Sequence, residues 1–261
     1  MREHYHAVLT MAVVLFAMAT AMAAVHFEED FEGYAAITDL TTAGPWDELS
    51  GAWSLSTAAN VTPGGMQSLL EPAGDDPAEL RAAFGPVPNV ELVEDTRLVV
   101  TFHTLTSATA ADLASDTVPY FSGVAIYSFD GELWEPGDLN EKVGFGYASD
   151  ASREYFAAHV VRWVAWDASE APLVPDSEWV KLTVSLDGSF AHFEGSDSGD
   201  VYTITYVPLP GGDGPPGAKE WNAVTVGHQS GSGNGIDIFY DDIEIRGGPA
   251  AGTMVEDWHL F

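Results

Sequence analysis

Short runs in which apolar and polar residues alternate recur along the whole chain, and Gly, Pro, Asp and Ser separate them. This alternation is typical of a β-strand with one face on a core and the other in solvent. So many short strands at this spacing indicate an all-β sandwich or barrel. No segment predicts a convincing amphipathic helix, and Ala108 to Ser115, long enough for about two turns, is the best candidate. The pattern predicts strands near 26–32, 52–57, 66–71, 79–84, 97–105, 120–129, 141–149, 154–166, 178–186, 190–194, 200–207, 221–228 and 236–245.

The first and the last predicted strands have the same character. FEEDFEGY at 27–34 and IDIFYDDIEI at 236–245 both interleave aromatic or aliphatic residues with carboxylates. Two such strands favour a two-sheet antiparallel β-sandwich in which the N- and C-terminal strands are adjacent. Their pairing would also gather Glu and Asp side chains from both ends of the chain around one point.

Turns and loops favour a single domain. Asp130-Gly131 and Asp187-Gly188 follow strand patterns, and Asp-Gly supplies the positive φ angles that tight hairpin turns need. PLPGGDGPPG at 208–217 has the composition of a long surface loop. We therefore predict one β-sandwich domain over 24–246, followed by a loosely attached tail over 247–261.

The segment 1–23 is predicted to be a signal peptide. Arg2 gives it a basic start, Ala7 to Thr20 is apolar, and Ala21-Met22-Ala23 supplies the small residues that a signal peptidase reads. A retained membrane anchor is the alternative, although the apolar run is short for one. No later segment is apolar enough to span a bilayer, so the mature protein is expected to be secreted and to act outside the cell or at its surface.

The chain carries 40 acidic residues against 9 basic ones, a formal net charge of −31. This charge argues against nucleic acid as a partner, because phosphate contacts need clustered Lys and Arg. Anionic membranes and strongly anionic polymers are repelled for the same reason. Two explanations of the acidity remain: a halophilic surface whose self-repulsion is screened in salty water, which accounts for most of the charge, and ligands for divalent cations. The chain has no cysteine, which excludes thiol catalysis and cysteine metal sites.

Several phrases of the sequence resemble those of bacterial concanavalin A-like jelly rolls, including the laminin-G-like group. They are DFEGY near the start, GGMQSLL at 64–70, EKVGFGY at 141–147, EWVKLTVSLDG at 178–188 and FYDDIEI at 239–245. The first and the last also resemble bacterial carbohydrate-binding modules that open with an FE-and-glycine word and close with a Y-x-D-D-[IV] word. The resemblance implies a jelly-roll sandwich, an architecture that hosts lectins, glycanases, lyases and structural domains.

The resemblance also implies a structural calcium ion between the terminal strands. In the resembling modules the Glu of the opening word and an Asp of the closing word hold it, which are Glu32 and Asp242 in this chain. Asp30 and Asp241 are neighbouring candidate ligands. On a regular strand Asp241 would point to the face opposite Asp242. The alternative is that these carboxylates are solvated edge residues that discourage aggregation between sheets.

A second candidate is a sugar-binding face. Read as one extended strand, EYFAAHVVRWVAW places Tyr155, His159 and Trp163 on one face, and RLVVTFHTLT places His103 outward. Aromatic rings stack on the C–H patches of sugars, and polar side chains meet their hydroxyls, so these residues would suit a binding groove. The alternative is that the aromatic residues cover a sheet or lie under a loop.

Enzymatic motifs are missing. Retaining glycanases need two carboxylates about 5 Å apart, and the E-x-D-x-x-E word that supplies them in laminarinase-like enzymes is absent. The alginate-lyase-like words are echoed only faintly, by AELRAAF at 78–84 and REYFAAHV at 153–160. The sequence therefore favours a non-catalytic protein that binds a neutral or weakly charged glycan. Two alternatives stay open: a structural or adhesive surface protein with protein partners, and a divergent glycoside hydrolase or polysaccharide lyase.

Overall fold

The computed structural model describes residues 24–72, 78–88, 92, 96–106, 120–127, 142–150, 153–160, 162–164, 178–187, 190–196, 201–208, 220–228 and 237–248. Within these ranges the secondary structure is almost entirely β. The strands are β1 (Val25–Glu29), β2 (Trp46–Ser50), β3 (Ser54–Ser56), β4 (Ser68–Glu71), β5 (Ala78–Pro88), β6 (Arg97–Thr106), β7 (Tyr120–Tyr127), β8 (Lys142–Asp150), β9 (Arg153–Val160), β10 (Arg162–Val164), β11 (Val180–Leu186), β12 (Phe190–Ser196), β13 (Val201–Pro208), β14 (Glu220–His228) and β15 (Ile238–Gly248).

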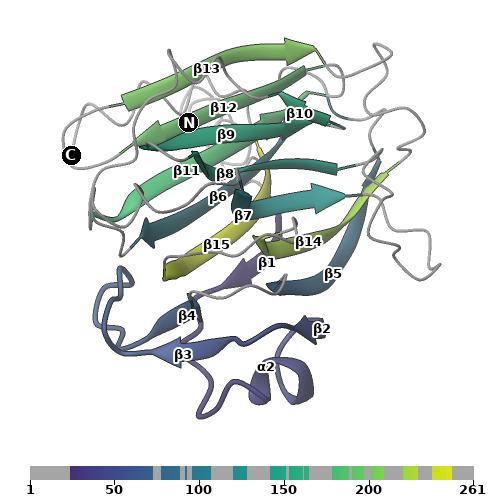
Figure 1. Ribbon diagram of the computed structural model, residues 1–261. Helices are drawn as coiled ribbons and strands as arrows, with labels where there is room; N and C mark the ends of the chain where they lie inside the picture. The colour runs from purple at the N-terminus through teal and green to yellow at the C-terminus, as the bar shows by residue number, and fades with distance from the viewer. Residues whose placement is uncertain are drawn as a thin grey trace, which may run out of the picture.

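The strands form two antiparallel sheets that pack face to face (Figure 1). Sheet A has eight strands in the order β13-β12-β11-β6-β15-β4-β3, with β1 also paired to β15. Sheet B has seven strands in the order β10-β9-β8-β7-β14-β5-β2. The single short helix, α2 (Asp39–Thr42), lies between β1 and β2 in the described part of the chain. The predicted all-β sandwich is confirmed.

The two terminal strands lie side by side, as their shared pattern predicted. β15 pairs with β6 along one edge, while its other edge is divided between two short strands. Its first residues pair with β4, where Tyr240 lies opposite Leu69. Its later residues pair with β1, where Ile243 lies opposite Glu29. In Figure 1 the purple β1 accordingly lies beside the yellow β15.

β15 contains a β-bulge at the point where its partner changes from β4 to β1. Asp241 lies opposite His103 of β6 and Glu244 lies opposite Thr101, so β15 has one residue more than β6 over this interval. Asp242 takes a φ of 48°, in the left-handed region that Asp tolerates better than most residues. An extra residue in one strand is the definition of a bulge, and it reverses which face each later residue occupies.

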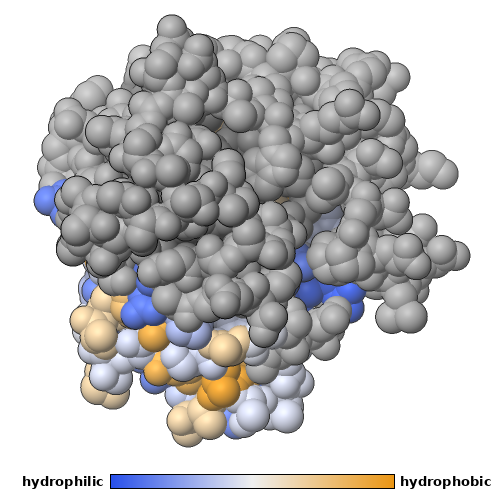
Figure 2. All heavy atoms as spheres, in the orientation of Figure 1, coloured by the Kyte–Doolittle hydropathy of each residue, from blue (hydrophilic) through white to orange (hydrophobic). Residues whose placement is uncertain are grey.

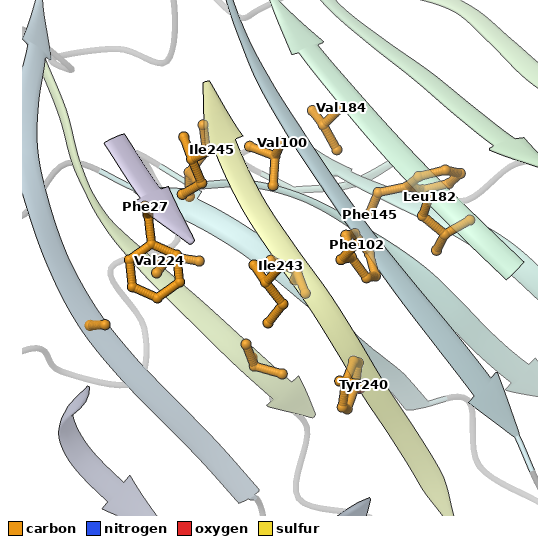
Figure 3. Close-up of a cluster of buried hydrophobic side chains, with 14 of the residues drawn as sticks. Phe27, Val100, Phe102, Phe145, Leu182, Val184, Val224, Tyr240, Ile243 and Ile245 are labelled. Atoms are coloured by element: carbon orange, nitrogen blue, oxygen red, sulfur yellow. The ribbon is translucent and has the colours of Figure 1, made fainter. Parts of the chain in front are cut away.

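The bulge keeps both halves of β15 on the core. Ile238 and Tyr240 before it and Ile243 and Ile245 after it are all buried between the sheets, which a regular alternation would not allow. Around them pack side chains from both sheets, among them Phe102, Phe145, Leu182 and Val224 (Figure 3). Burial of this continuous apolar core is the main stabilising contribution to the fold.

A buried carboxylate ties the first strand to the segment that follows it. Glu29 is 6% exposed, and its Oε1 accepts a hydrogen bond of 2.8 Å from the Phe31 backbone N–H. Its Oε2 accepts hydrogen bonds from the Tyr34 hydroxyl at 2.7 Å and from Trp46 Nε1 at 3.0 Å. The Phe31 and Trp46 rings stack with 6.1 Å between their centroids. These donors satisfy the charge of Glu29 inside an otherwise apolar cluster.

The outer surface is mixed in character where the described residues form it. Figure 2 shows small groups of hydrophobic residues among polar ones at the lower end of the molecule, where Figure 1 places α2, β3 and β4. Met66, which is 75% exposed, is one of the apolar residues at the surface. In the described residues, no helix has the length and apolar character needed to cross a membrane.

The predicted strands agree with the observed ones, with two differences. The sequence did not predict β2, a strand in which Trp46 is buried and which pairs with β5. The strand predicted over 154–166 is instead two strands, β9 and β10, which pair antiparallel with each other. The helical candidate at 108–115 lies outside the described residues.

Candidate functional site

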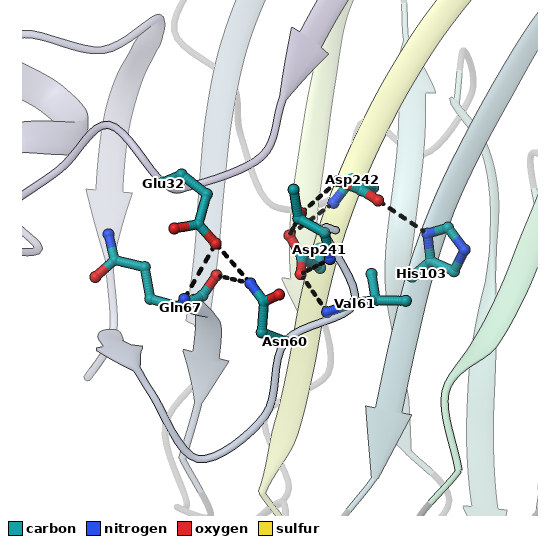
Figure 4. A network of polar contacts seen from close by, with 8 residues as sticks. Glu32, Asn60, Val61, Gln67, His103, Asp241 and Asp242 are labelled. Atoms are coloured by element: carbon teal, nitrogen blue, oxygen red, sulfur yellow. Dashed lines mark hydrogen bonds and ion pairs between the residues drawn. The ribbon is translucent and has the colours of Figure 1, made fainter. Parts of the chain in front are cut away.

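The four acidic residues predicted as metal ligands lie at or near the β15 bulge. Asp241 is fully buried, and its Oδ2 accepts hydrogen bonds from the backbone N–H groups of Val61 at 2.9 Å and Thr62 at 3.4 Å. Its Oδ1 accepts a hydrogen bond of 3.0 Å from the Asp242 backbone N–H. Asp241 therefore holds the loop between β3 and β4 against β15 (Figure 4).

Both carboxylates of the bulge contact the same hydroxyl. Thr62 Oγ1 lies 2.6 Å from Asp242 Oδ1 and 3.2 Å from Asp241 Oδ1. A hydroxyl has one proton to donate, and the shorter contact assigns that proton to Asp242. The contact to Asp241 is then favourable when Asp241 is protonated and donates to Thr62. Burial, the largest effect, raises the pKa of Asp241 to about 6, which favours the protonated form at mildly acidic pH.

Glu32 occupies a separate group of donors in the same loop. Its Oε1 accepts hydrogen bonds from Asn60 Nδ2 at 2.6 Å, the Met66 backbone N–H at 2.8 Å and the Gln67 backbone N–H at 3.1 Å. A Cβ at Gly65 would meet this oxygen, so a larger residue there would force the Glu32 carboxylate to move. Glu32 thus acts as an anion bound by three N–H donors, an arrangement that lowers the pKa of its carboxyl group despite the opposing effect of desolvation.

These contacts bear on the predicted calcium ion. Glu32 faces the Asn60 and Gln67 side of the loop, whereas Asp242 faces Thr62 and His103 (Figure 4). Among the described residues, no group of three or more His, Asp or Glu side chains is placed to hold a metal ion. An ion shared by Glu32 and Asp242 would have to displace hydrogen bonds that protein donors make. Calcium therefore stays a prediction, and we assign it no role below.

The expectation for a regular strand at Asp241 and Asp242 was wrong. We expected their side chains on opposite faces, but the bulge lets both reach Thr62. Asp30 lies beyond the end of β1, where its Oδ1 accepts a hydrogen bond of 3.0 Å from the Glu32 backbone N–H. It supports the turn that presents Glu32.

The four predicted ligand-binding residues do not form one site. His103 lies on β6 of sheet A, two residues from Thr101, which pairs with Glu244, and directly opposite Lys181 of β11. Tyr155, His159 and Trp163 lie on β9 and β10, at one edge of sheet B. In β6 the core residue Phe102 precedes His103, so His103 is on the side of sheet A that faces away from sheet B.

His103 instead lines a polar cavity of about 270 Å³ on that outer side of sheet A. Burial, with a smaller effect of the Lys181 ammonium, lowers the pKa of His103 to about 4. The imidazole is therefore neutral at physiological pH. Its Nδ1 is buried and has no hydrogen-bond partner, and the nearest acid oxygen, Asp242 Oδ2, lies 3.8 Å away.

Tyr155, His159 and Trp163 share one face of sheet B, although not as residues of one strand. Trp163 of β10 lies directly opposite His159 of β9, and opposite residues of paired strands occupy the same face. Alternation along β9 puts Tyr155 on that face as well. His159 pairs with Gly144 of β8, which lies between the core residues Val143 and Phe145. The shared face is therefore the outer face of sheet B.

A row of residues in register crosses this outer face from β5 to β10. Its middle positions are small, and larger residues occupy both ends. Parallel to it runs a second row that is smaller still, with Gly227, Gly123, Gly146 and Ala157 in register. We refer below to this band of small residues, which lies between larger ones, as the trough. The first row is Arg81, Thr225, Ala125, Gly144, His159 and Trp163.

Thr225 is the unusual residue in the floor of this trough. It lies between the core residues Val224 and Val226, so its side chain is on the outer face. Thr225 is 2% exposed, yet its hydroxyl has no hydrogen-bond partner in the protein. A buried polar group without a partner costs about 1–3 kcal/mol. Such a group in a native fold points to a ligand or a water molecule that the protein binds there.

Sequence reasoning missed Thr225, Arg81 and the glycine rows. The only available signal was the pair Gly144 and Gly146 in EKVGFGY, two glycines at strand spacing where side chains would be expected. Glycine inside a strand often marks the close approach of a ligand or another backbone. Assigning the other members of the rows needs the register of six strands, which no local pattern contains.

Comparisons with known proteins concern the fold. No protein-family model matches the chain, and no curated protein matches it. Among solved structures, it is similar to lectin II from Ulex europaeus, with 11% identity over 86% of this chain and 100% of the lectin and a TM-score of 0.50. It is also similar to lectin I-B4 from Griffonia simplicifolia (11% identity, 84% and 98% coverage, TM-score 0.47) and to the CBM2 module of the evolved Dit of Lactobacillus casei BL23 phage J-1 (12%, 88% and 97%, 0.48).

The similarity to the Ulex lectin, together with the two antiparallel sheets, defines the class of fold. It is a two-sheet antiparallel β-sandwich, the fold that the resemblance in sequence implied. At 11% identity the similarity extends to the fold and no further.

The protonation of Asp241 predicts a specific pH dependence. Its pKa is about 6 in the folded protein against an ordinary 3.8, so the folded state binds the proton more tightly. Stability is therefore higher below the ordinary value and falls as pH rises through about 6, by up to about 3 kcal/mol. Asp241→Asn keeps an acceptor for Val61 and adds a donor for Thr62, although it loses the acceptor for the Asp242 N–H. Because the amide does not titrate, the variant should remove this dependence.

The measurement is urea denaturation in EDTA between about pH 4 and pH 8. The free energy of unfolding of the wild type minus that of Asp241→Asn should fall across this range and level off above pH 7. The control is Glu28→Gln, which removes an exposed charge from β1 and should give a nearly constant difference. A flat difference for Asp241→Asn would mean that Asp241 is ionised throughout.

The calcium prediction is tested by thermal unfolding in EDTA and in millimolar calcium. A structural ion stabilises the folded state by mass action. If it is present, the melting temperature falls in EDTA, recovers with calcium, and responds far less in Asp242→Ala. Magnesium at the same concentration controls for ionic strength. An equal melting temperature in both buffers would retire the ion and leave the protein donors as the full set of partners for Glu32 and Asp241.

Proposed function

We propose that this protein binds a glycan, without catalysis, in the trough on the outer face of sheet B. The observation that carries the proposal is the buried, unpartnered Thr225 hydroxyl in a floor of small residues. A sugar hydroxyl would satisfy it. Small residues inside a strand often mark the close approach of a ligand, and the ends of the row carry the residue types that sugars contact.

The two ends of the trough have different chemistry. On one side the backbone register places His159, Trp163 and Tyr155, residue types that combine aromatic surface with polar atoms. On the other side it places Arg81 and Glu79 of β5, which offer donors and acceptors for hydroxyl groups. A glycan that crosses the strands would meet both. The net charge of −31 favours a neutral or weakly charged glycan over an anionic one.

The setting of this activity is part of the proposal. The predicted signal peptide supports action outside the cell or at the cell surface, where polysaccharides are accessible ligands. The lectin-like fold supports glycan binding in general, because it hosts many binding proteins, but it does not select a ligand. The choice of a glycan as the ligand therefore rests on the residues of the trough.

The test starts with the purified mature chain on a glycan array, followed by calorimetric titration with the glycan that binds best. Thr225→Val keeps the side-chain shape and removes the hydroxyl. It should weaken binding by about 2- to 10-fold, the value of one hydrogen bond, without lowering the melting temperature. Trp163→Ala and Tyr155→Ala should weaken binding by about tenfold or more, because stacking area is lost.

Thr104→Val is the matched control. Thr104 is also a buried threonine, but it lies in sheet A and donates a hydrogen bond of 3.0 Å to the Phe239 carbonyl. Its replacement should lower stability by about 1–2 kcal/mol and leave glycan affinity unchanged. Equal affinity in the wild type and Thr225→Val would place the glycan elsewhere. An array without any bound glycan would overturn the function and favour a surface protein with protein partners.

A further inference from the structure

The polar cavity on sheet A is far from the trough in the fold, on the opposite outer face of the sandwich. Side chains from four adjacent strands line it, and the β15 bulge forms part of its wall. At about 270 Å³ it is the size of a site for a small molecule. Its lining includes the charged or titratable residues Asp30, His103, Lys181, Asp242, Glu244 and Arg246.

The two cations of the cavity already have acidic partners. Arg246 forms an ion pair with Glu244. Burial lowers the pKa of Lys181, and the nearby carboxylates of Glu244, Asp242 and Glu194 act in the opposite direction. Five acidic residues line the cavity against these two cations. Even if the buried Glu29 is left out, the lining carries a net charge of −2 (four carboxylates against two cations). The cavity therefore attracts a positive charge.

Polar atoms of the cavity that can accept hydrogen bonds lie on the β1 side and the β6 side of the bulge. Asp242 uses Oδ1 for Thr62 and has Oδ2 directed toward His103, at a distance of 3.8 Å from Nδ1 that is too long for a hydrogen bond. His103 Nδ1 is buried without a hydrogen-bond partner. Asp30 uses Oδ1 for the Glu32 N–H, and its carboxylate also lines the cavity.

The chemistry of these atoms selects the ligand. His103 Nδ1 is buried without a hydrogen-bond partner 3.8 Å from Asp242 Oδ2, and an imidazole nitrogen that carries no proton is an acceptor beside the Asp242 and Asp30 carboxylates. A group that bridges them must donate several hydrogens from one atom and fit a negative cavity. A primary ammonium group has three N–H donors and a positive charge. A water molecule has two donors and no charge, and a hydroxyl has one.

We propose that this cavity binds the primary ammonium group of a small polar ligand, with Asp242, His103 and Asp30 as its acceptors. This site is distinct from the proposed glycan trough and does not depend on it. An ammonium group in the cavity would give a shared partner to His103 Nδ1 and Asp242 Oδ2, which lie too far apart to bond each other.

Methylammonium is the probe, and tetramethylammonium is the matched cation, since it carries the same charge but no N–H donor. Titrations in about 0.5 M NaCl, where surface charges are screened, and in EDTA, which removes divalent ions, isolate the hydrogen-bonded part. The readouts are the imidazole ¹⁵N resonances of His103 and the backbone amide resonances of β6 and β15. We expect a saturable shift with methylammonium and at least tenfold weaker binding of tetramethylammonium.

Two variants test the acceptors. Asp242→Asn keeps an oxygen for Thr62 but turns the cavity-facing atom into a donor, and it should abolish the amide shifts. If Asp242→Asn fails to fold, His103→Leu on β6 removes the second acceptor instead and should also abolish the amide shifts. Glu220→Gln, on β14 of sheet B, removes one negative charge and should leave methylammonium binding unchanged.

Three results would overturn the proposal. Equal responses to both cations would show that only the charge matters. Unchanged methylammonium binding in a folded Asp242→Asn or His103→Leu would place the ligand elsewhere. A response of the same resonances to calcium alone, in a titration without EDTA, would replace the ammonium with the predicted metal ion.

Discussion

The structure depends on one extra residue in its last strand. β15 is the strand of sheet A that joins both ends of the chain, with β6 on one edge and β4 and β1 in turn on the other. Where the partner on this second edge changes from β4 to β1, the strand adjusts which side chains face the core. The bulge at Asp241 and Asp242 makes this adjustment, and the left-handed φ of Asp242 is its backbone signature. The result is that Tyr240 and Ile243 are both buried in the same core.

The same adjustment produces the polar features at this end of the sandwich. The bulge turns the Asp241 and Asp242 carboxylates toward Thr62, which fixes the loop between β3 and β4. It also leaves Asp242 Oδ2 short of His103 and so forms one side of the polar cavity. A device that closes the fold therefore also generates a candidate binding site. The trough on sheet B has a different origin, since it follows from small residues in register, with Thr225 at its centre.

Much of the fold could be predicted from the sequence, because strand alternation is a local signal. The acidic words at the two ends of the chain correctly indicated the pairing of β1 with β15. β2 was missed because WDELS is short and its two apolar residues, Trp46 and Leu49, do not alternate, since the register with β5 shifts between Trp46 and Glu48. The segment 154–166 appeared as one strand because β9 and β10 are joined so tightly that Arg162 pairs with Val160, and no Gly, Pro or Asn marks the reversal.

The sites were harder to predict because they depend on register. Tyr155, His159 and Trp163 share a face as predicted, but the reason is the pairing of two strands and not alternation along one. His103 was grouped with them although it belongs to the other sheet. The bulge itself could not be read, since two consecutive Asp residues look alike in a regular and a bulged strand.

Removing the extra residue tests the central claim most directly. Deletion of Asp242 would restore regular alternation and move Ile243 and Ile245 out of the core, each at a cost of about 2–5 kcal/mol. We expect the deletion to lower the melting temperature by more than about 10 °C, or to leave no folded protein. Asp242→Gly, which keeps the residue count and suits the left-handed φ, should stay within a few degrees of the wild type. A deletion variant with the same melting temperature as the wild type would show that the fold does not depend on the bulge.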